Sequence, residues 1–472
     1  MGRKRTKPFF ENIEVVDAGA KGKSIAKAPD GKVIFLSNAI PGDVVDVQTF
    51  KKRKAYYEGK ATKFIKYSDK RVTAKCEHFG TCGGCKWQSM DYNEQLFYKN
   101  QEVTQNLKRI GKLEVEEFLP IKPSAETFYY RNKMEFTFSS NRWLTLEEIQ
   151  SETVVADRNA LGFHLPGMWD KILDIKNCHL QPEPSNSIRL ALKAFSEKEN
   201  IPFFNLRTHE GLLRTIMIRT ASTKEVMVVV QFFENNQEQI TKVLDFLKSE
   251  FPEITSLQYV VNNKANDTLY DQDIICYHGK DFIEEEMEGL RFKIGAKSFY
   301  QTNSKQAYEL YKITRDFAGI TKEDIVYDLY TGTGTIALFI AQKAQKVIGV
   351  EYVPEAIADA KQNAINNGID NASFFVGDMK KVFTPEFVAQ NGTPDIVITD
   401  PPRDGMHKDV VAHLLATAPK KIVYVSCNSA TQARDLQILS EKYTINKSQA
   451  VDMFPQTHHV ENVTLLTLKS EK

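Results

Sequence analysis

The sequence predicts an α/β protein whose C-terminal part is a parallel, Rossmann-like sheet, preceded by a small β-barrel and a mixed α+β central region. From residue 324 onward, apolar strands alternate with amphipathic helices, which is typical of a parallel sheet covered on both faces. Residues 8–67 instead read as short strands broken by glycine and proline turns, which favours a five-stranded barrel of the oligonucleotide-binding type. The central region mixes strands with helical patterns at 187–198 and 236–250.

These patterns divide the chain into three predicted domains. We expect a barrel over 1–67, a central domain over 68–90 and 125–288, and a sheet domain over 91–124 and 289–472. In the sheet domain, a helix is expected from Tyr92 to about Ile110, ended by Gly111. The segments 443–454 and 460–469 are expected to form a hairpin at the edge of the sheet.

Charge is distributed unevenly along this chain of 472 residues, whose formal net charge is only +1. Residues 1–75 carry 18 Lys and Arg against 8 Asp and Glu, so the remainder is acidic. A basic N-terminal module that contains Lys51-Lys52-Arg53-Lys54 favours RNA or DNA as a partner. Because the start at Met1-Gly2-Arg3-Lys4-Arg5 lacks the pattern of a signal peptide and no stretch could span a membrane, we expect a cytoplasmic protein. Neither a membrane nor an obligate protein partner is implied.

Cys427 ends a buried strand that begins at Lys421, just before a helix. Ser429 and Gln432 are expected to form the capping box of that helix. Ligands of open α/β sheets bind at the carboxyl ends of the strands, and a thiol beside a helix N-terminus is activated, so Cys427 is a candidate nucleophile. Core packing is the alternative, because free cysteine is among the most buried residue types.

A glycine-rich turn, Asp328-Leu329-Tyr330-Thr331-Gly332-Thr333-Gly334-Thr335, follows the first strand of the sheet. Its glycines allow close approach to a ligand, and Glu351 ends the next strand, where a carboxylate can accept hydrogen bonds from ribose hydroxyls. The third glycine of the dinucleotide fingerprint is missing, which disfavours NAD and FAD and favours S-adenosylmethionine. A purely structural turn is the alternative.

The fourth strand ends at Asp400-Pro401-Pro402-Arg403, where the prolines fix the backbone so that the carboxylate enters the same crevice. Amino-directed DNA and RNA methyltransferases carry a similar Asp-Pro-Pro, but with an aromatic residue next, which stacks on the flipped base. Arg403 takes that place here, which weakens the interpretation as an amino-directed enzyme.

Several motifs, in the same order, resemble the uracil-C5 RNA methyltransferase family. They are the glycine-rich turn, Asp400–Arg403, Phe299-Tyr300-Gln301-Thr302-Asn303, Val425-Ser426-Cys427-Asn428 and the run from Asp452 to Glu461 that contains Pro455-Gln456-Thr457-His458-His459. The resemblance extends over nearly the whole chain, because members that act on large-subunit ribosomal RNA also carry an N-terminal TRAM barrel and a four-cysteine iron–sulfur site. It implies a class I methyltransferase domain that uses S-adenosylmethionine.

The resemblance also implies roles for single residues. Cys427 would add to C6 of uracil, which makes C5 nucleophilic, and Glu461 would remove the C5 proton after methyl transfer. We assign cofactor binding or orientation of the base to Gln301, Tyr330, Thr335, Glu351, Asp378 and Asp400. Asparagine and phenylalanine are usual in the family at the positions of Thr335 and Tyr330.

The remaining cysteines suggest a metal centre. Cys76, Cys82 and Cys85 lie within ten residues, and Cys178 supplies a fourth soft ligand, although His78 or His179 could replace a thiolate. The spacing alone fits zinc and an iron–sulfur cluster equally well, and the resemblance implies a structural [4Fe–4S] cluster.

Two other features receive a structural interpretation. Cys276 is expected to pack in the core. His458 and His459 are expected to lie in a strand and to point to opposite faces, so that they cannot share a metal.

The sequence therefore predicts an S-adenosylmethionine-dependent RNA uracil-C5 methyltransferase, with 23S ribosomal RNA as the expected substrate. The barrel would grip the RNA backbone while the target base is flipped into the crevice. Three alternatives stay open: a transfer RNA substrate, amino-directed methylation through Asp400-Pro401-Pro402, and a non-catalytic RNA-binding protein with a degenerate cofactor domain.

Overall fold

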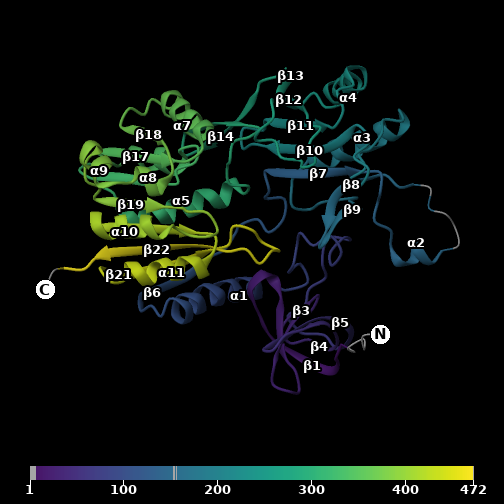
Figure 1. Cartoon of the computed structure of the whole chain (residues 1–472), viewed down its shortest axis with the longest axis horizontal. Helices are drawn as coiled ribbons and strands as arrows, with labels where there is room; N and C mark the ends of the chain where they lie inside the picture. Colours follow the sequence, from purple (N-terminus) through teal and green to yellow (C-terminus); the bar gives the residue numbers. More distant parts are fainter. Residues whose placement is uncertain (1–6, 152–154, 156, 471–472) are drawn as a thin grey trace. The chain divides into compact units, whose positions relative to one another are not determined.

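The computed structural model of the protein describes residues 7–151, 155 and 157–470 (Figure 1). Residues 1–6, which the predicted barrel domain includes, lie outside the described residues. Two compact units make up the chain, and each is described by itself. The first comprises 1–127, 402–405 and 425–464, and the second comprises 128–401, 406–424 and 465–472. The three domain boundaries expected above stay a prediction. None of the helices in the described residues is long and apolar enough to cross a membrane.

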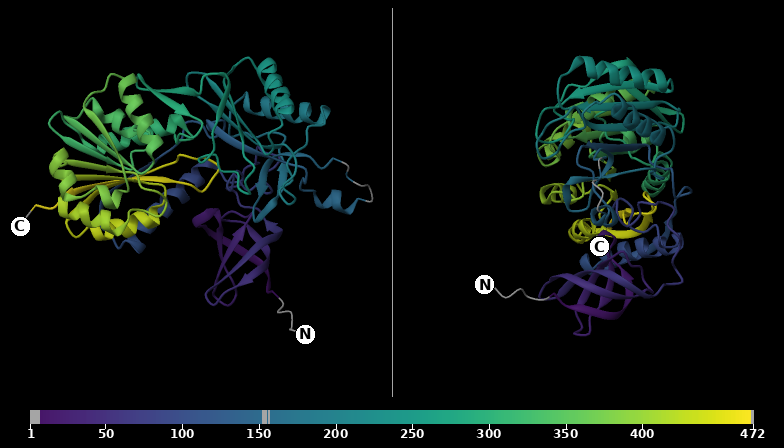
Figure 2. Two further views of the ribbon diagram at one scale, coloured as in Figure 1. Left: turned by 45° about the horizontal axis from the view of Figure 1, so that its top comes forward. Right: turned by 90° about the vertical axis from the view of Figure 1, so that its right-hand side faces the viewer.

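The N-terminal part of the first unit is a closed five-stranded barrel, as predicted (Figure 2). Alternation of apolar and polar residues brings Ile34, Leu36, Val45 and Val47 into its core. Strands β3 and β5 run parallel, whereas the other neighbouring pairs run antiparallel. The barrel order is β1 (Phe9–Ala18), β2 (Ser24–Lys27), β3 (Val33–Ser37), β5 (Tyr56–Lys66) and β4 (Val44–Lys52), with a short 3₁₀ turn at Ala20–Gly22.

Helix α1 (Tyr92–Gln105) of the first unit starts and ends where the sequence indicates. The Asp91 carboxylate accepts the backbone N–H of Asn93 at 2.9 Å, and a final π-helical turn (Asn106–Ile110) reaches Gly111. The chain then forms β6 (Val115–Lys122), which pairs in parallel with β21 (Tyr443–Val451). The expected hairpin at the sheet edge is therefore wrong in one respect: β22 (Glu461–Leu468) lies beside β21, but β6 is the edge strand.

The central region is a seven-stranded sheet in the second unit. Helices α3 (Ser185–Lys198) and α4 (Gln237–Glu250) share one face of it and bury Ile188, Leu192, Val243 and Leu244 against its strands (Figure 1). The strand order is β13 (Ile275–Gly279), β12 (Ile254–Val261), β11 (Val226–Phe232), β10 (Leu213–Thr220), β7 (Lys133–Ser139), β8 (Ala160–Leu165) and β9 (Met168–Asp174). Helix α2 (Leu146–Gln150) and a hairpin of β14 (Phe282–Met287) and β15 (Leu290–Gly295) complete this region.

The C-terminal region confirms the predicted Rossmann-like sheet. Its parallel strands have the order β18 (Ala372–Val376), β17 (Lys346–Glu351), β16 (Ile325–Leu329), β19 (Ile396–Thr399) and β20 (Lys421–Ser426), followed by β22, β21 and β6. The chain leaves β16 toward β17 and later returns to β19, so the order switches beside β16, where such sheets bind ligands. The helices are α5 (Ser304–Ala318), α6 (Thr335–Ala341), α7 (Pro354–Asn366), α8 (Met379–Val382), α9 (Pro385–Asn391), α10 (Lys408–Thr417) and α11 (Ser429–Leu439).

Candidate active site

The glycine-rich turn of the second unit lies directly after β16, at the switch point. Tyr330 has a φ of 66°, which is unusual for a residue with a side chain, and the backbone N–H groups of Tyr330 and Thr331 both donate to the carbonyl of Val350. Gly334 has a φ of 79° and caps α6; a Cβ there would lie 2.9 Å from the Cβ of Ala360. The turn is thus wound so tightly that only glycine fits at Gly334.

Two carboxylates, one fully buried and one partly buried, end neighbouring strands beside this turn. Asp328, on β16, is fully buried; its Oδ2 accepts the Thr331 hydroxyl at 2.5 Å, while its Oδ1 has no partner among the described residues. Burial raises the pKa of Asp328 to about 7, and the charge of Glu351 adds to this effect. Burial and the charge of Asp328 also raise the pKa of Asp400, which follows β19. A buried oxygen without a partner in the protein fits a ligand-binding site, because donors of a nucleoside would satisfy it.

The other predicted cofactor residues of this unit have identifiable positions. Glu351, at the end of β17, accepts the Gly332 N–H at 3.2 Å with one oxygen and the Tyr352 and Val353 N–H groups with the other. Thr335 is the first residue of α6, with its hydroxyl 3.4 Å from that of Tyr311.

Gln301 and Asp378 are also fixed locally. The Gln301 carbonyl accepts the Asn132 side-chain amide at 2.9 Å, and the same amide donates to the Ser304 hydroxyl. Asp378 caps α8 by accepting the Lys380 N–H at 3.3 Å. A carboxylate used as a cap is a weaker candidate for ligand contact than Asp328.

Cys427, in the first unit, occupies the turn between β20 and α11 and is half-buried. The expected capping box of Ser429 and Gln432 is wrong, because Asn428 caps the helix by accepting the Ala430 N–H at 3.1 Å. Gln432 is buried instead and exchanges hydrogen bonds with Asn462. The Asn428 amide also donates to the carbonyl of Arg403 at 2.9 Å, which ties the loop after Asp400-Pro401-Pro402 to the turn of the thiol.

Glu461 opens β22, the neighbour of β20 in the sheet, and is 6% exposed. The loop before it is anchored at two points. Asp452 pairs with Lys99 at 2.6 Å, with both side chains fully buried, and the Lys99 ammonium also donates to the carbonyl of Phe454. The carbonyl of Gln456 accepts the N–H groups of Lys86 and Trp87 at 2.9 and 3.0 Å. These contacts fix the backbone that leads into Glu461.

The two histidines of this loop do not behave as expected. They lie outside any strand, and their rings pack together with centroids 4.1 Å apart, so the prediction of opposite faces is wrong. Burial, together with the positive groups around it, lowers the pKa of His458 to about 3, so this ring is neutral at physiological pH.

The predicted metal ligands are divided between the units: Cys76, Cys82 and Cys85 belong to the first and Cys178 to the second. All are half-buried and form no disulfide. Within the residues described, no three or more His, Cys, Asp and Glu side chains are grouped so that they could hold a metal ion. Cys276 does not pack in the core as expected but is exposed on β13.

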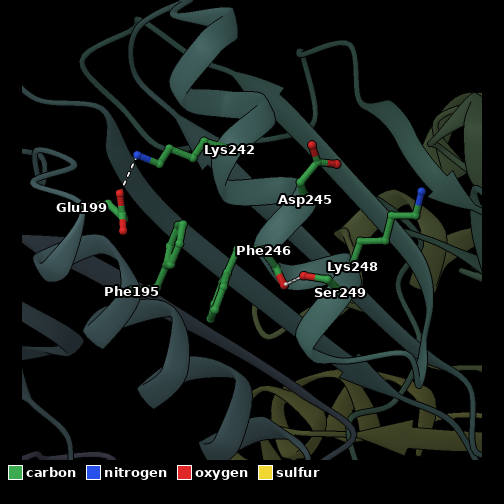
Figure 3. A pocket seen from close by; sticks show the side chains of 7 residues that line it. All are labelled: Phe195, Glu199, Lys242, Asp245, Phe246, Lys248 and Ser249. Atoms are coloured by element: carbon green, nitrogen blue, oxygen red, sulfur yellow. Dashed lines mark hydrogen bonds and ion pairs between the residues drawn. The ribbon is translucent and has the colours of Figure 1, made fainter.

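A shallow hollow of about 600 Å³ between α3 and α4 contains none of the predicted site residues (Figure 3). The Phe195 and Phe246 rings stack there with centroids 4.0 Å apart, and Lys242 pairs with Glu199 at 2.5 Å. None of the side chains that line it has a buried polar atom without a partner. The hollow is part of the packing of the two helices rather than a second reaction site.

Comparison with known proteins decides the family. A family model described as tRNA (Uracil-5-)-methyltransferase matches residues 213–469. The chain belongs to this family. It is therefore an S-adenosylmethionine-dependent RNA uracil-5 methyltransferase, as predicted, and neither amino-directed methylation nor a non-catalytic role is favoured.

Similar proteins support the same conclusion over nearly the full length. An RNA methyltransferase of Bacteroides thetaiotaomicron, described as uncharacterized, is 56% identical over 95% of this chain and 100% of its own. One of Chlorobaculum tepidum, described in the same way, is 37% identical over 96% of this chain and 95% of its own. Among solved structures, the tRNA (uracil-54, C5)-methyltransferase of Pyrococcus abyssi in complex with S-adenosyl-L-homocysteine has a TM-score of 0.74 at 30% identity, covering 96% of this chain and 100% of that one.

Sequence reasoning missed Asp328 as a site residue. A charged residue inside the apolar strand Ile325-Val326-Tyr327-Asp328-Leu329 is the signal that could have found it, because an ionisable group is rarely fully buried without a partner. In a cofactor site, the unpartnered Oδ1 of Asp328 makes it as good a candidate as Glu351.

Proposed function

We propose that the protein methylates C5 of a uridine in RNA through a covalent bond between Cys427 and C6 of the base, with Glu461 as the base that removes the C5 proton. The observation that carries the proposal is the placement of the two groups on neighbouring strands: Cys427 directly follows β20 and Glu461 opens β22. The half-buried thiol, the Asn428 cap and the anchored loop before Glu461 all support it.

The chemistry explains why a thiol and a carboxylate are both needed. The Cys427 sulfur forms a bond to C6, the C5–C6 π electrons move onto the O4 enolate, and C5 becomes nucleophilic. S-adenosylmethionine, when bound, supplies an electrophilic methyl group. We propose that Asp328, Glu351 and Asp400, with the glycine-rich turn, hold it, together with Gln301, Tyr330, Thr335 and Asp378. Glu461 then takes the C5 proton, the C5–C6 double bond re-forms, and the thiolate leaves.

RNA that contains 5-fluorouridine at the target tests this assignment. Fluorine cannot leave C5 as a proton does, so the full-length protein with S-adenosylmethionine should accumulate an adduct that survives denaturing electrophoresis. Cys427→Ala should form none, whereas Cys276→Ala, which removes an exposed thiol on β13, should behave as wild type. An adduct with Cys427→Ala would exclude this nucleophile. Glu461→Gln should accumulate the methylated adduct on ordinary RNA, and normal turnover of that variant would assign the base to another group.

We propose large-subunit ribosomal RNA as the substrate, because the basic barrel and the four cysteines resemble the members that act on it. A cytoplasmic location is part of the same proposal, since the RNA substrate is found there. Transfer RNA is the second candidate, favoured by the description of the matching family and by the substrate named for the Pyrococcus abyssi structure. Transfer of a labelled methyl group to total RNA, followed by separation of ribosomal from transfer RNA, distinguishes the two. Label confined to transfer RNA would overturn the first.

We also propose that Cys76, Cys82, Cys85 and Cys178 bind a [4Fe–4S] cluster with a structural role. Their half-buried thiols, which form no disulfide, and their spacing support this. Iron and acid-labile sulfide should be found in anaerobically purified protein and lost in Cys82→Ser, but retained in Cys276→Ser. Zinc without sulfide in the purified protein would show that the four cysteines bind zinc, the other metal that their spacing fits.

A further inference from the structure

Three side chains at the end of barrel strand β5 form what we call the stacking group: Phe64, Tyr67 and Arg71. The rings of Phe64 and Tyr67 are nearly parallel, 18° apart in plane, with centroids separated by 5.0 Å. The Arg71 guanidinium lies 4.8 Å from the centroid of Phe64 and 5.4 Å from that of Tyr67. Despite these contacts, Tyr67 is 63% exposed.

Arg71 is held in place by a fully buried carboxylate. Its Nε and one terminal nitrogen donate to the two oxygens of Asp43 at 2.8 and 2.7 Å. Asp43 in turn accepts the backbone N–H groups of Ile40 and Ser68. The bidentate pair fixes the guanidinium plane, so the ring of Tyr67 rests on a preorganised support and little freedom is lost when a ligand binds on it.

Closure of the barrel alone does not explain this arrangement. Phe64 is half-buried and packs against the barrel core. A tyrosine that served only as a lid would bury most of its ring, whereas Tyr67 leaves most of its surface in water. Exposed aromatic rings on a rigid support are the surfaces on which unpaired bases stack.

The charges around the group indicate the partner. Lys23 and Lys51 both pair with Glu58, so their charges are compensated. In contrast, Lys63 and Lys66, from the same strand as Phe64, are exposed and form no ion pair within the described residues. An exposed aromatic ring that directly follows a strand with uncompensated cations suits a polyanion that carries flat aromatic groups, which is single-stranded nucleic acid.

We propose that the stacking group binds one unpaired nucleobase of the substrate RNA on the exposed face of Tyr67, while Lys63 and Lys66 contact the flanking phosphates. The inference rests on the proposed function, which makes RNA the substrate and therefore the polyanion that the barrel binds. It adds base stacking to the backbone grip expected of the barrel.

Anisotropy of a fluorescein-labelled single-stranded RNA, titrated with the full-length protein at several salt concentrations, tests this assignment. Tyr67→Ala should weaken binding about 5- to 150-fold, the range for loss of one base–aromatic stack. Tyr67→Leu, which keeps an apolar cover on Phe64, should weaken it as much, and Tyr67→Phe should bind as wild type. None of these variants should change the slope of log K against log salt, whereas each of Lys63→Ala and Lys66→Ala should reduce it by about 0.7.

Phe9 offers a matched control, because it is an aromatic residue of the same barrel with 49% exposure and no ring or cation contact within the described residues. Phe9→Ala should bind RNA within about twofold of wild type. Normal binding by Tyr67→Leu, or equal weakening by Phe9→Ala, would overturn the proposal.

The 5-fluorouridine adduct separates this inference from the proposed function. Wild type and Phe9→Ala should both form the adduct, because Phe9 lies outside the stacking group. If none of the proteins forms the adduct but Tyr67→Leu binds RNA more weakly than wild type, the covalent mechanism is refuted and the stacking group is not. Normal adduct formation with normal binding of that variant would refute the stacking group alone.

Discussion

Replacing Lys99 by methionine should destabilise the first unit at the loop that leads to Glu461. The Lys99 ammonium lies 2.6 Å from Asp452, and neither side chain is exposed. Asp452 also accepts the Tyr92 hydroxyl at 2.8 Å, so the carboxylate cannot move to water without breaking a second contact. Removal of the ammonium therefore leaves a buried charge with only one neutral donor at its other oxygen.

The magnitude follows from the geometry. At 2.6 Å the attraction between the two charges is about 6 kcal/mol for an effective dielectric constant of about 20. Desolvation offsets much of this attraction, and burial lowers the pKa of Lys99 while the charge of Asp452 raises it. Loss of one partner of a buried pair costs about 3–5 kcal/mol, because the remaining charge is uncompensated.

Urea unfolding and amide hydrogen exchange over residues 452–461 measure this loss. Lys99→Met should lower the free energy of unfolding by about 3–5 kcal/mol, and Lys99→Met with Asp452→Asn should recover part of it. Lys70→Met is the control, because Lys70 pairs with Glu94 at the same 2.6 Å but with side chains 38% and 26% exposed. It should cost at most about 1 kcal/mol. Equal effects of Lys99→Met and Lys70→Met, or no recovery in the double variant, would refute the reasoning.

Three further substitutions probe the glycine-rich turn of the second unit and the turn of the thiol in the first. The pKa of Asp328 is raised from 3.8 to about 7, so the free energy of unfolding of the wild type should fall as pH rises through this range. Asp328→Asn should remove this dependence of stability on pH, so the Tm of the variant relative to wild type should increase from about pH 5 to about pH 8. Gly334→Ala forces a side chain into a left-handed position against Ala360, so the turn should shift and S-adenosylmethionine binding should weaken about 5- to 30-fold by calorimetry; unchanged affinity would show that the turn does not need glycine. Asn428→Ala removes the cap of α11 and should cost about 1 kcal/mol in urea unfolding and slow adduct formation; an adduct rate equal to wild type would show that the cap does not position Cys427.

The layers of the fold could be predicted because they follow from local periodicity. Strands β16 to β20 and the helices between them have patterns that need no distant partner to be recognised. The helix start at α11 could not be predicted in the same way. Ser429 and Gln432 have the spacing of a capping box, but Asn428 is an equally good cap one residue earlier, and Gln432 finds its partner in Asn462, 30 residues away.

The rest of the site depends on contacts that the sequence does not encode locally. The edge position of β6 is set by its pairing with β21, and the sequence of neither strand indicates that the other is its partner. The burial of Asp328 depends on the neighbours of β16 on both sides. The sequence predicts a strand at His458 and His459, but the loop that contains them is fixed by Lys99 and by the carbonyl of Gln456 instead.

The pairing of β6 with β21 has a consequence for the order in which the enzyme matures. Asn446 and Glu116, on these strands, are joined by a hydrogen bond across 330 residues. Contacts between residues so far apart in sequence form late, because the entropy of closing a long loop is lost before the contacts stabilise the chain. The barrel, built from contiguous residues, can fold while the chain is still being synthesised. The segment that carries Cys427 and Glu461 completes its unit only after β21 has been made, so the barrel of a nascent chain can fold well before Cys427 is in place.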